Sequence, residues 1–573
     1  MLALLGTGVG LLVAGVLWVL VTGLMARSQL RQVGAELPQL RSALLSGQLH
    51  RAQQIASDIR GHAARAHDLT TGPAWWVSAN LPAIGTPLRT GRTVAAATER
   101  IGTRVLPGVL ALGRTLDGPT LRHGATIDLP RLERAQPVLD RAAETVGATV
   151  EQVRDAPASS WLSPVDDARA RALHALERLR DDLRGAGRAM HTALPMLGAA
   201  GPRRYFVGFE NEAEARGLGG LPGAFAIVVA DHGRLRFTHF ENDSALRGIS
   251  AGKVDLGAGF LRRYGSSDPT GTYIDSDVSP HFPYAARIWA AMWQRASGEH
   301  VDGAVAIDPT ALQYLLRVTG PVTVGHGLTI GAGNVVSFTE SGQYARFTDR
   351  DRRKAVLVTM ARSIAARLLR GSDSTRLIRA AAHAAGERRL VLWSADRAVE
   401  RRLVAAGYAG ALPSGTAPVS GFTVTNVTGT KLDYYLERSM TYRRSGCGPR
   451  GTATATLRLT NTAPRSGLPA YVTTRYDRPP PDARTGDNRL LVSYYATAGA
   501  RIEAVRVDGR PVTVAAGTEQ GLAVITLDVE LPAGASRILV VRTAEPPARE
   551  RVRILKQPLA RDLAVSVTGA ECG

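Results

Sequence analysis

Apolar and polar positions divide the chain into segments with different periodicities. Residues 2–25 contain no charged side chain, and at a rise of ~1.5 Å per residue such a run is long enough for a hydrocarbon core of ~30 Å. From 27 to 200, apolar residues recur at spacings of three and four, which is typical of amphipathic helices. We therefore predict an uncleaved transmembrane anchor over 1–26 and a helical stalk or bundle over 27–200.

Strand-like runs and helical patterns alternate over 201–412. Short apolar or alternating runs that predict strands occupy 204–209, 224–230, 234–241 and 301–308. Helical patterns occupy 283–297, 309–320, about 350–370 and most of the stretch from there to 410. This alternation predicts an α/β domain.

The remaining segment, 413–573, has the pattern of an all-β domain. From about residue 419, runs of alternating apolar and polar residues are separated by turn residues such as Asp508-Gly509. Strands at this spacing predict a β-sandwich. Its sequence contains no obvious cluster of titratable residues, so we expect a binding or support module rather than a catalytic one.

Composition narrows the possible partners. The chain of 573 residues should hold more than one domain. Its net charge of +20 is the difference between 70 basic residues, of which only four are lysine, and 50 acidic residues. A GC-rich coding sequence would explain this excess of arginine, and an anionic partner such as phospholipid or a phosphate-rich glycan is the alternative. No basic run is interleaved with aromatics and no zinc-finger spacing occurs, so we do not expect nucleic-acid binding.

Two cysteines, Cys447 and Cys572, lie in the last quarter of the chain. A single disulfide between them would tie down the C-terminus and would require an oxidising compartment. Two unpaired thiols are the alternative.

The densest polar block is FENEAEARGLGGLPG at 209–223, directly after a predicted strand. It places Asn211, Glu212, Glu214 and Arg216 beside several glycines. Carboxylates, an amide and an arginine at a strand end followed by a glycine turn are typical of ligand crevices in α/β proteins, and glycine lets backbone N–H groups approach an anion. A surface loop with solvated charges is the alternative. HExxH, GxSxG, CxxC and P-loop signatures are absent from the sequence.

Two further blocks could converge on this crevice. Glu241-Asn242-Asp243 follows the third predicted strand, and the stretch 346–354 opens the long helix. The arginines of that stretch are Arg346, Arg350, Arg352 and Arg353. Arginine at a helix N-terminus is unfavourable in isolation, but a bound pyrophosphate would reverse that penalty. A solvated helix face neutralised by nearby aspartates is the alternative.

The segment of about 200–370 closely resembles an uncharacterised bacterial family, domain of unknown function four-zero-one-two. RYFVGFENEAEARGLGGLPGAFAIV, DSDVSPHFPYAARIWAAMW and VDGAVAIDPTALQYLLRVTGPVTV carry this resemblance. The upstream anchor and helices look like those of actinobacterial members. More distantly, the order of strand, VDGAVAID-type strand, helix and Arg-rich helix start is similar to the LytR-CpsA-Psr family. Members of that family are anchored outside the membrane, bind polyprenyl-pyrophosphate glycolipids through arginines and transfer glycopolymers to the cell wall.

The distant resemblance implies roles for the polar residues. Arg216 would match the first anion-binding arginine, and Asp243 would lie near the acidic position after the strand. Arg346 and either Arg352 or Arg353 would match the late arginines. Glu212 or Glu214 would have to replace the aspartate that binds magnesium, because this chain reads Arg216-Gly-Leu-Gly where that family has Arg-x-Asp.

Together these expectations define a site and a function. Catalysis would use Glu212, Glu214 and Asp243, with Mg²⁺ held by Glu214 and Asp243. Pyrophosphate would be bound by Asn211, Arg216, Arg346, Arg350, Arg352 and Arg353. The expected fold is multidomain: a transmembrane helix, a helical stalk or bundle, an α/β LytR-CpsA-Psr-like domain over 201–412 and a β-sandwich over 413–573. The expected function is binding, and transfer, of a polyprenyl-pyrophosphate-linked glycopolymer; the alternative is a non-catalytic envelope scaffold or polysaccharide-export accessory protein.

The expected location is the cell membrane, with one span and the bulk of the chain extracytoplasmic. Arg27, Arg31 and Arg41 follow the apolar stretch, so the positive-inside rule alone would place the bulk in the cytoplasm. The disulfide and the family resemblance outweigh that rule here.

Overall fold

The computed structural model describes residues 2–82, 85–115, 121–157, 161–325, 327–370, 373–514 and 516–569, although the side chains of 2–13, 45 and 115 are outside the described part. The chain forms two compact units. The first contains residues 1–123 and 127–199, and the second contains 124–126 and 200–573.

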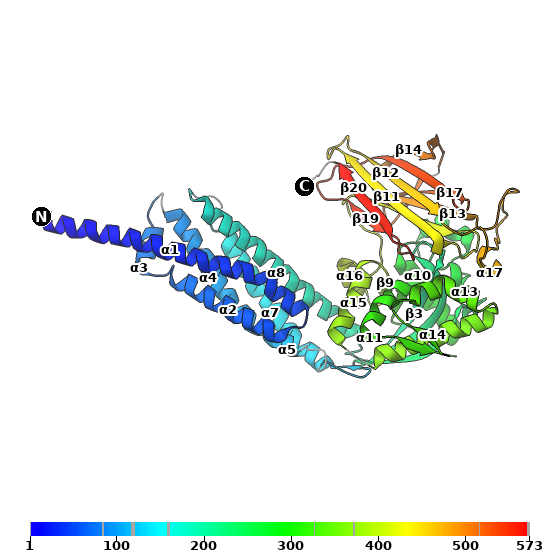
Figure 1. Cartoon of the computed structure of the whole chain (residues 1–573), viewed down its shortest axis with the longest axis horizontal. Helices are drawn as coiled ribbons and strands as arrows, with labels where there is room; N and C mark the ends of the chain where they lie inside the picture. The colour runs from blue at the N-terminus through cyan, green and yellow to red at the C-terminus, as the bar shows by residue number, and fades with distance from the viewer. Residues whose placement is uncertain are drawn as a thin grey trace. The chain divides into compact units, whose positions relative to one another are not determined.

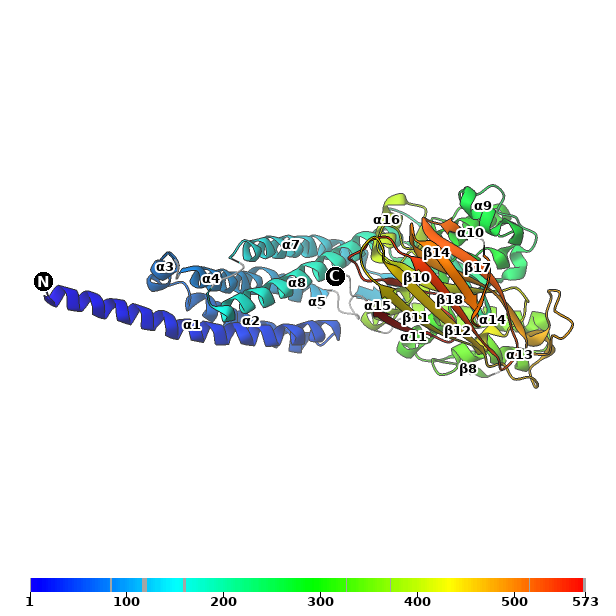
Figure 2. The same ribbon diagram turned by 90° about the horizontal axis from the view of Figure 1, so that it is seen from above.

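The first unit is a bundle of helices that lie side by side (Figures 1 and 2). Its helices are α1 (Leu2–Leu45), α2 (Leu49–Asp68), α3 (Pro73–Ala79), α4 (Gly85–Arg100), α5 (Leu106–Thr115), α7 (Leu129–Arg154) and α8 (Ser163–Met196). Alanine and branched residues at helical spacing, among them Ala52, Ile59, Val146 and Val150, form its core. Small side chains such as alanine allow neighbouring helix axes to approach closely.

The predicted transmembrane helix is corrected by the structure. No helix in the described part of the chain is both long and apolar enough to cross a membrane. One face of α1 packs inside the bundle, where Val19, Thr22 and Ala26 are buried. The indole Nε1 of Trp75 in α3 donates a 2.8 Å hydrogen bond to the Thr22 hydroxyl. The apolar stretch is part of a 44-residue helix, and its other face, with Leu17, Trp18 and Leu20, is exposed.

A mixed sheet forms the centre of the second unit, and five strands of this seven-stranded sheet follow the order β5-β4-β3-β6-β9. Its strands are β3 (Arg203–Ala215), β4 (Gly220–Asp231), β5 (Arg234–Asn242), β6 (Gly303–Ile307) and β9 (Leu390–Ser394). β3 pairs with β4 in an antiparallel hairpin and with β6 in parallel. β9 is antiparallel to β6 and lies between two helices in a stretch expected to be mainly helical. Its run LVLWS is too short and too apolar for an amphipathic helix, which explains the strand.

Helices cover both faces of this sheet (Figure 1). α10 (Phe282–Ser297) packs on one face, around Phe206 and Trp289. A β-carbon on Gly208 would lie 2.6 Å from the Trp289 ring, so only glycine permits this approach. The other face packs against α11 (Pro309–Thr319), α14 (Arg350–Leu369) and α15 (Ser374–Gly386). α16 (Arg397–Ala406) follows β9.

The C-terminal half of the second unit consists of two sheets that share one apolar core. One sheet has the order β16-β17-β13-β10-β19, and the other has the order β15-β14-β18-β12-β11-β20. The strands are β10 (Val419–Asn426), β11 (Leu436–Ser445), β12 (Thr452–Asn461), β13 (Asn488–Ala498), β14 (Arg501–Val507), β15 (Arg510–Pro511), β16 (Ala516–Glu519), β17 (Leu522–Leu531), β18 (Ser536–Ala544), β19 (Arg553–Lys556) and β20 (Leu563–Gly569). Alternating inward residues such as Leu457, Val492 and Leu539 fill the space between the sheets. We call this half the β-sandwich.

Candidate functional site

The polar block at 209–223 lies within two paired strands rather than in a loop after a strand. β3 continues to Ala215 and β4 begins at Gly220, with register shifts between Phe209 and Glu210 and between Asn211 and Ala215. A β-carbon on Gly220 would lie 2.3 Å from the carbonyl carbon of Asn211. A β-carbon on Gly217 would lie 2.0 Å from the carbonyl oxygen of Val278. These two glycines therefore allow close backbone packing.

Arg216 is 5% exposed, and all three of its guanidinium nitrogens donate to protein acceptors. Nε donates to Asp275 at 3.1 Å and Nη2 donates to Glu214 at 2.9 Å. Nη1 donates to the carbonyls of Ala215 at 3.1 Å and Asn426 at 3.4 Å. The side chain expected to bind pyrophosphate is thus fully engaged by β3, a neighbouring loop and the β-sandwich.

Glu214 has a second cationic partner, because Lys431 of the β-sandwich forms an ion pair with it. Both side chains are buried. Burial lowers the pKa of Lys431 to about 8. This buried ion pair links β3 to the β-sandwich. Removal of either partner would leave an unpaired buried charge, which is strongly destabilising.

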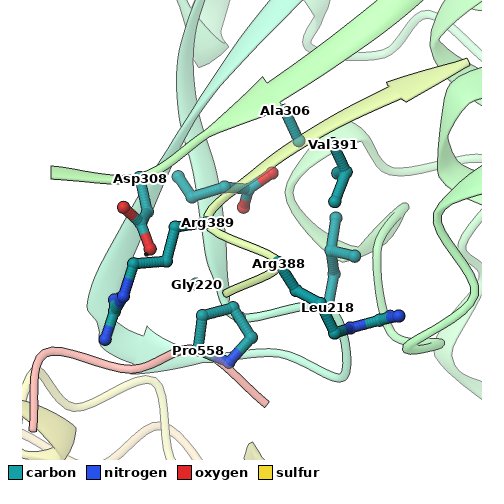
Figure 3. Close-up of a pocket in the computed structure, with 10 residues that line it drawn as sticks. Leu218, Gly220, Ala306, Asp308, Arg388, Arg389, Val391 and Pro558 are labelled. Atoms are coloured by element: carbon teal, nitrogen blue, oxygen red, sulfur yellow. Dashed lines mark hydrogen bonds and ion pairs between the residues drawn. The ribbon is translucent and has the colours of Figure 1, made fainter. Parts of the chain in front are cut away.

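A second buried cation, Arg389, joins the same two parts. Its Nη1 donates to Asp308 at 2.9 Å and to Glu212 at 3.4 Å. Its Nη2 donates to Asp562 at 2.6 Å and to the Leu559 carbonyl at 3.2 Å, both in the β-sandwich. Asp308 also caps α11 by accepting a 2.6 Å bond from the Ala311 N–H. Figure 3 shows Asp308 and Arg389 next to each other beside Pro558.

A cavity next to this pair is too small for a substrate. It measures about 10 Å³ and is lined in part by Glu210, Asp308, Arg388 and Arg389 (Figure 3). A volume of roughly 10–15 Å³ holds a single water molecule. Arg388 is directed to backbone carbonyls, donating at 2.6 Å to Pro280, at 2.9 Å to Gly410 and at 3.1 Å to Ala411.

Several carboxyls near β3 are held in a water-poor environment. No N–H or O–H group of the described residues donates to either oxygen of Glu210 or Asp277. Burial raises the pKa of Asp277 to about 8 and raises that of Glu210 well above its usual range. Burial also raises the pKa of Glu212, and raises that of Glu340 to about 8. A proton shared between Glu210 and Asp277 would give each carboxyl a hydrogen-bond partner.

The remaining expected site residues are spread over the start of α14 and its surroundings. Asp243 forms a 2.7 Å ion pair with Lys354. Arg353 is buried, with its guanidinium 4.1 Å from the ring centre of Tyr471 and 5.2 Å from that of Tyr344. The Tyr344 hydroxyl accepts a 2.9 Å bond from Asn211, so Asn211 and Arg353 share one neighbour. Arg346, Arg350 and Arg352 are exposed.

These residues do not fit a magnesium ion. Glu214 is paired with Arg216 and Lys431, whereas Asp243 is paired with Lys354. Within the described residues, no three His, Cys, Asp or Glu side chains lie in position to hold a metal ion. Mg²⁺ in proteins is usually bound through one or two free carboxylates in near-octahedral geometry, and both expected carboxylates are taken up by cationic side chains.

Cys447 lies in the connection between β11 and β12 and is disulfide-bonded. Cys572, its expected partner, lies outside the described residues. The pairing of these two cysteines therefore stays a prediction.

Residues 200–344 match the model of a family described as Protein of unknown function (DUF4012). No curated protein matches the chain. The DUF4012 segment includes the strands β3 to β6 together with α10 and α11. It contains Arg216 and Asp308 but excludes Arg389 and the β-sandwich, which are their partners.

Sequence reasoning missed the buried partners of the DUF4012 segment. Asp308 was recognisable only as the residue before a helix that begins at a proline, and its ion pair with Arg389 had no signal. Lys431 and Asp433 lie in a turn of the β-sandwich more than 200 residues from Arg216. Only the fold brings these residues together.

Proposed function

We propose that this chain is a non-catalytic scaffold protein of the cell envelope. The observation that carries the proposal is the full engagement of Arg216 by protein acceptors. The cavity beside Asp308 and Arg389, at about 10 Å³, adds no room for a substrate. A transferase needs free cationic groups aimed at the charge that develops on its substrate. Here the same groups hold two domains together.

The scaffold role follows from how the α/β domain and the β-sandwich are joined. Arg216, Glu214 and Arg389 each form buried polar contacts with the β-sandwich. A joint built from several buried charges favours one fixed arrangement, which suits a protein that presents surfaces to partners.

The location in the cell envelope is supported by the disulfide-bonded state of Cys447. Disulfides persist in oxidising compartments and are rare where thiols are kept reduced. The proposal also includes an actinobacterial origin and a distant relationship to the LytR-CpsA-Psr family. In this proposal the chain keeps the fold of such an enzyme, and Arg216 has a structural role instead of binding pyrophosphate.

The test is a turnover assay on the full chain with a short polyprenyl-pyrophosphate-linked disaccharide, with and without Mg²⁺. Release of polyprenyl phosphate is the readout, and we expect none above the rate without protein. Magnesium-dependent release that Glu212→Gln abolishes, in a variant that unfolds at the wild-type midpoint, would show a transferase and overturn the scaffold proposal.

A stability measurement tests the structural role of Arg216 directly. Arg216→Ala would leave Glu214 and Asp275 without one partner each, and breaking a buried pair in this way costs about 3–5 kcal/mol. The matched control is Arg443→Ala, which removes an exposed arginine of β11 and should change the free energy of unfolding by less than about 0.5 kcal/mol. Equal effects of the two variants would contradict the role given to Arg216.

A further inference from the structure

A basin rich in arginine lies beside the C-terminal half of α14. Its other wall is β7 (Val322–Val324), which pairs with β8 (Leu328–Ile330). The volume is about 330 Å³, at the lower end of the roughly 300–1,000 Å³ of ligand pockets. The polar residues that line it are Arg362, Ser363, Arg367, Arg370 and Thr323.

The helix places these groups on one face. Ser363 and Arg367 are four residues apart, and Arg367 and the C-cap residue Arg370 are three apart, which brings these side chains to the same side of the helix. Like charges at such spacings are mutually destabilising. No acidic side chain is among the described residues that line the basin, so only the helix dipole at the C-terminal end of α14 offsets that repulsion.

One of the three arginines is fixed in place. Arg367 donates through Nε to the Thr319 carbonyl at 2.7 Å. Gly320 follows, with φ +82°, and a β-carbon there would lie 3.3 Å from Nη2 of Arg367. In the described part of the chain the two terminal nitrogens of Arg367 have no hydrogen-bond acceptor. The guanidinium is therefore held by one edge while its other donors remain available.

The other two arginines are less engaged still. The Arg362 guanidinium lies 5.6 Å from the ring centre of Phe240. Neither Arg362 nor Arg370 forms a side-chain hydrogen bond or ion pair with any described residue. Arg475 of the β-sandwich shows the contrast, since Asp477 and Glu530 both pair with it. Arg362, Arg367 and Arg370 are exposed, and none of them forms an ion pair with a described residue.

We propose that this basin binds a ligand through a doubly charged phosphate group. Three guanidinium groups supply forked N–H donors that match phosphate oxygens, and Ser363 and Thr323 supply hydroxyl donors from the two walls. A dianion balances more of the positive charge than a carboxylate does. The phosphate could belong to a soluble compound or to a lipid headgroup. The inference goes beyond the scaffold role and does not depend on it.

Titration of the full chain with inorganic pyrophosphate at low ionic strength, followed by calorimetry, tests the proposal. We expect binding to one site, weakened at least about tenfold in the variant Arg362→Gln with Arg370→Gln, because each charge-assisted hydrogen bond contributes strongly. The matched control is Arg443→Gln with Arg458→Gln, which removes two exposed arginines of the β-sandwich. It changes the net charge equally and should alter affinity by less than about twofold.

Absence of binding, or equal weakening in both double variants, would overturn the proposal. Arg370→Gln alone keeps the test valid if the basin double variant unfolds, since that side chain is exposed; we expect it to weaken binding about threefold. Sedimentation with phosphatidic acid vesicles, beside vesicles of phosphatidylcholine alone, separates the two sources of phosphate. Loss of sedimentation in the basin variant assigns a lipid headgroup, and unchanged sedimentation with weakened pyrophosphate binding assigns a soluble compound.

Discussion

The backbone N–H of Ala215, the last residue of β3, donates a 2.7 Å hydrogen bond to the carboxylate of Asp433 in the β-sandwich. Asp433 is fully buried and also accepts bonds from the side-chain amides of Asn426 at 2.8 Å and Asn488 at 2.7 Å. A single carboxylate thus ends the central strand of one domain and orders two strands of the other. The two domains of the second unit meet through a shared hydrogen-bond network.

Asp433→Ala should strongly destabilise the second unit. The substitution leaves the N–H of Ala215 and the amides of Asn426 and Asn488 without their acceptor, and each unsatisfied buried group costs about 1–3 kcal/mol. We expect urea denaturation to give a free energy of unfolding lower by at least about 3 kcal/mol. The control is Asp528→Ala, which removes a partly exposed partner of Arg489 and should cost about 0–1 kcal/mol. Similar losses in both variants would contradict the network.

A second joint centres on Glu519. Its carboxylate accepts hydrogen bonds from Ser279 at 2.5 Å and from Tyr264 and Tyr495 at 2.7 Å each. Arg263 lies 3.3 Å away as its cationic partner. Glu519→Gln removes the charge and one acceptor, so we expect a loss of about 1–3 kcal/mol in urea denaturation. Glu503→Gln, at an exposed position of β14 that pairs with Arg542, is the control. A Glu519 variant as stable as that control would show that this joint contributes little.

The sequence predicts the regular elements of the DUF4012 segment well. VDGAVAID contains β6, and the helix predicted over 309–320 is α11 (Pro309–Thr319). The helix predicted over 283–297 is α10 (Phe282–Ser297). These elements have a clear apolar period and a proline near the helix start, so local physics is enough to place them.

The candidate site was harder to predict because its charges are buried. Glu210, Glu212 and Glu214 alternate with Asn211 and other residues, which is itself the period of a strand. A charged strand face is normally solvated, so the pattern favoured a surface loop or a crevice. The partners that permit burial lie far along the chain: 177 residues separate Glu212 from Arg389. Pairing over such distances leaves no mark in local sequence.

Stability of the second unit should fall as pH rises from about 4 to 8. Burial raises the pKa of Asp277 to about 8, whereas an unfolded aspartate titrates near ~3.9. Between these values the folded chain keeps a proton that the unfolded chain releases, so raising the pH favours unfolding. Asp277→Asn removes this titration and should reduce the slope of unfolding free energy against pH by up to about 1.4 kcal/mol per pH unit. Urea denaturation at several pH values gives the slope.

The control for this pH dependence is Asp528→Asn, because Asp528 is partly exposed in the β-sandwich. Its slope should match that of the wild type. At pH 8 the Asp277→Asn variant should unfold at a clearly higher temperature than the wild type, because it does not ionise at this buried position. An unchanged slope in Asp277→Asn would mean that Asp277 is ionised in the folded chain throughout this range. That result would contradict a proton shared between Asp277 and Glu210.

The thiol state of the native chain tests both the disulfide and the proposed compartment. The sequence contains two cysteines, and Cys447 is disulfide-bonded. If Cys572 is its partner, denatured protein kept free of reductant should react with no maleimide, and reduced protein should react with two equivalents. Cys447→Ser is the control, since it should leave one reactive thiol without reductant and should lower stability by about 2–4 kcal/mol through the lost cross-link. Two reactive thiols in unreduced wild type would remove the support that the disulfide gives to an envelope location, because reduced thiols are what a reducing compartment maintains.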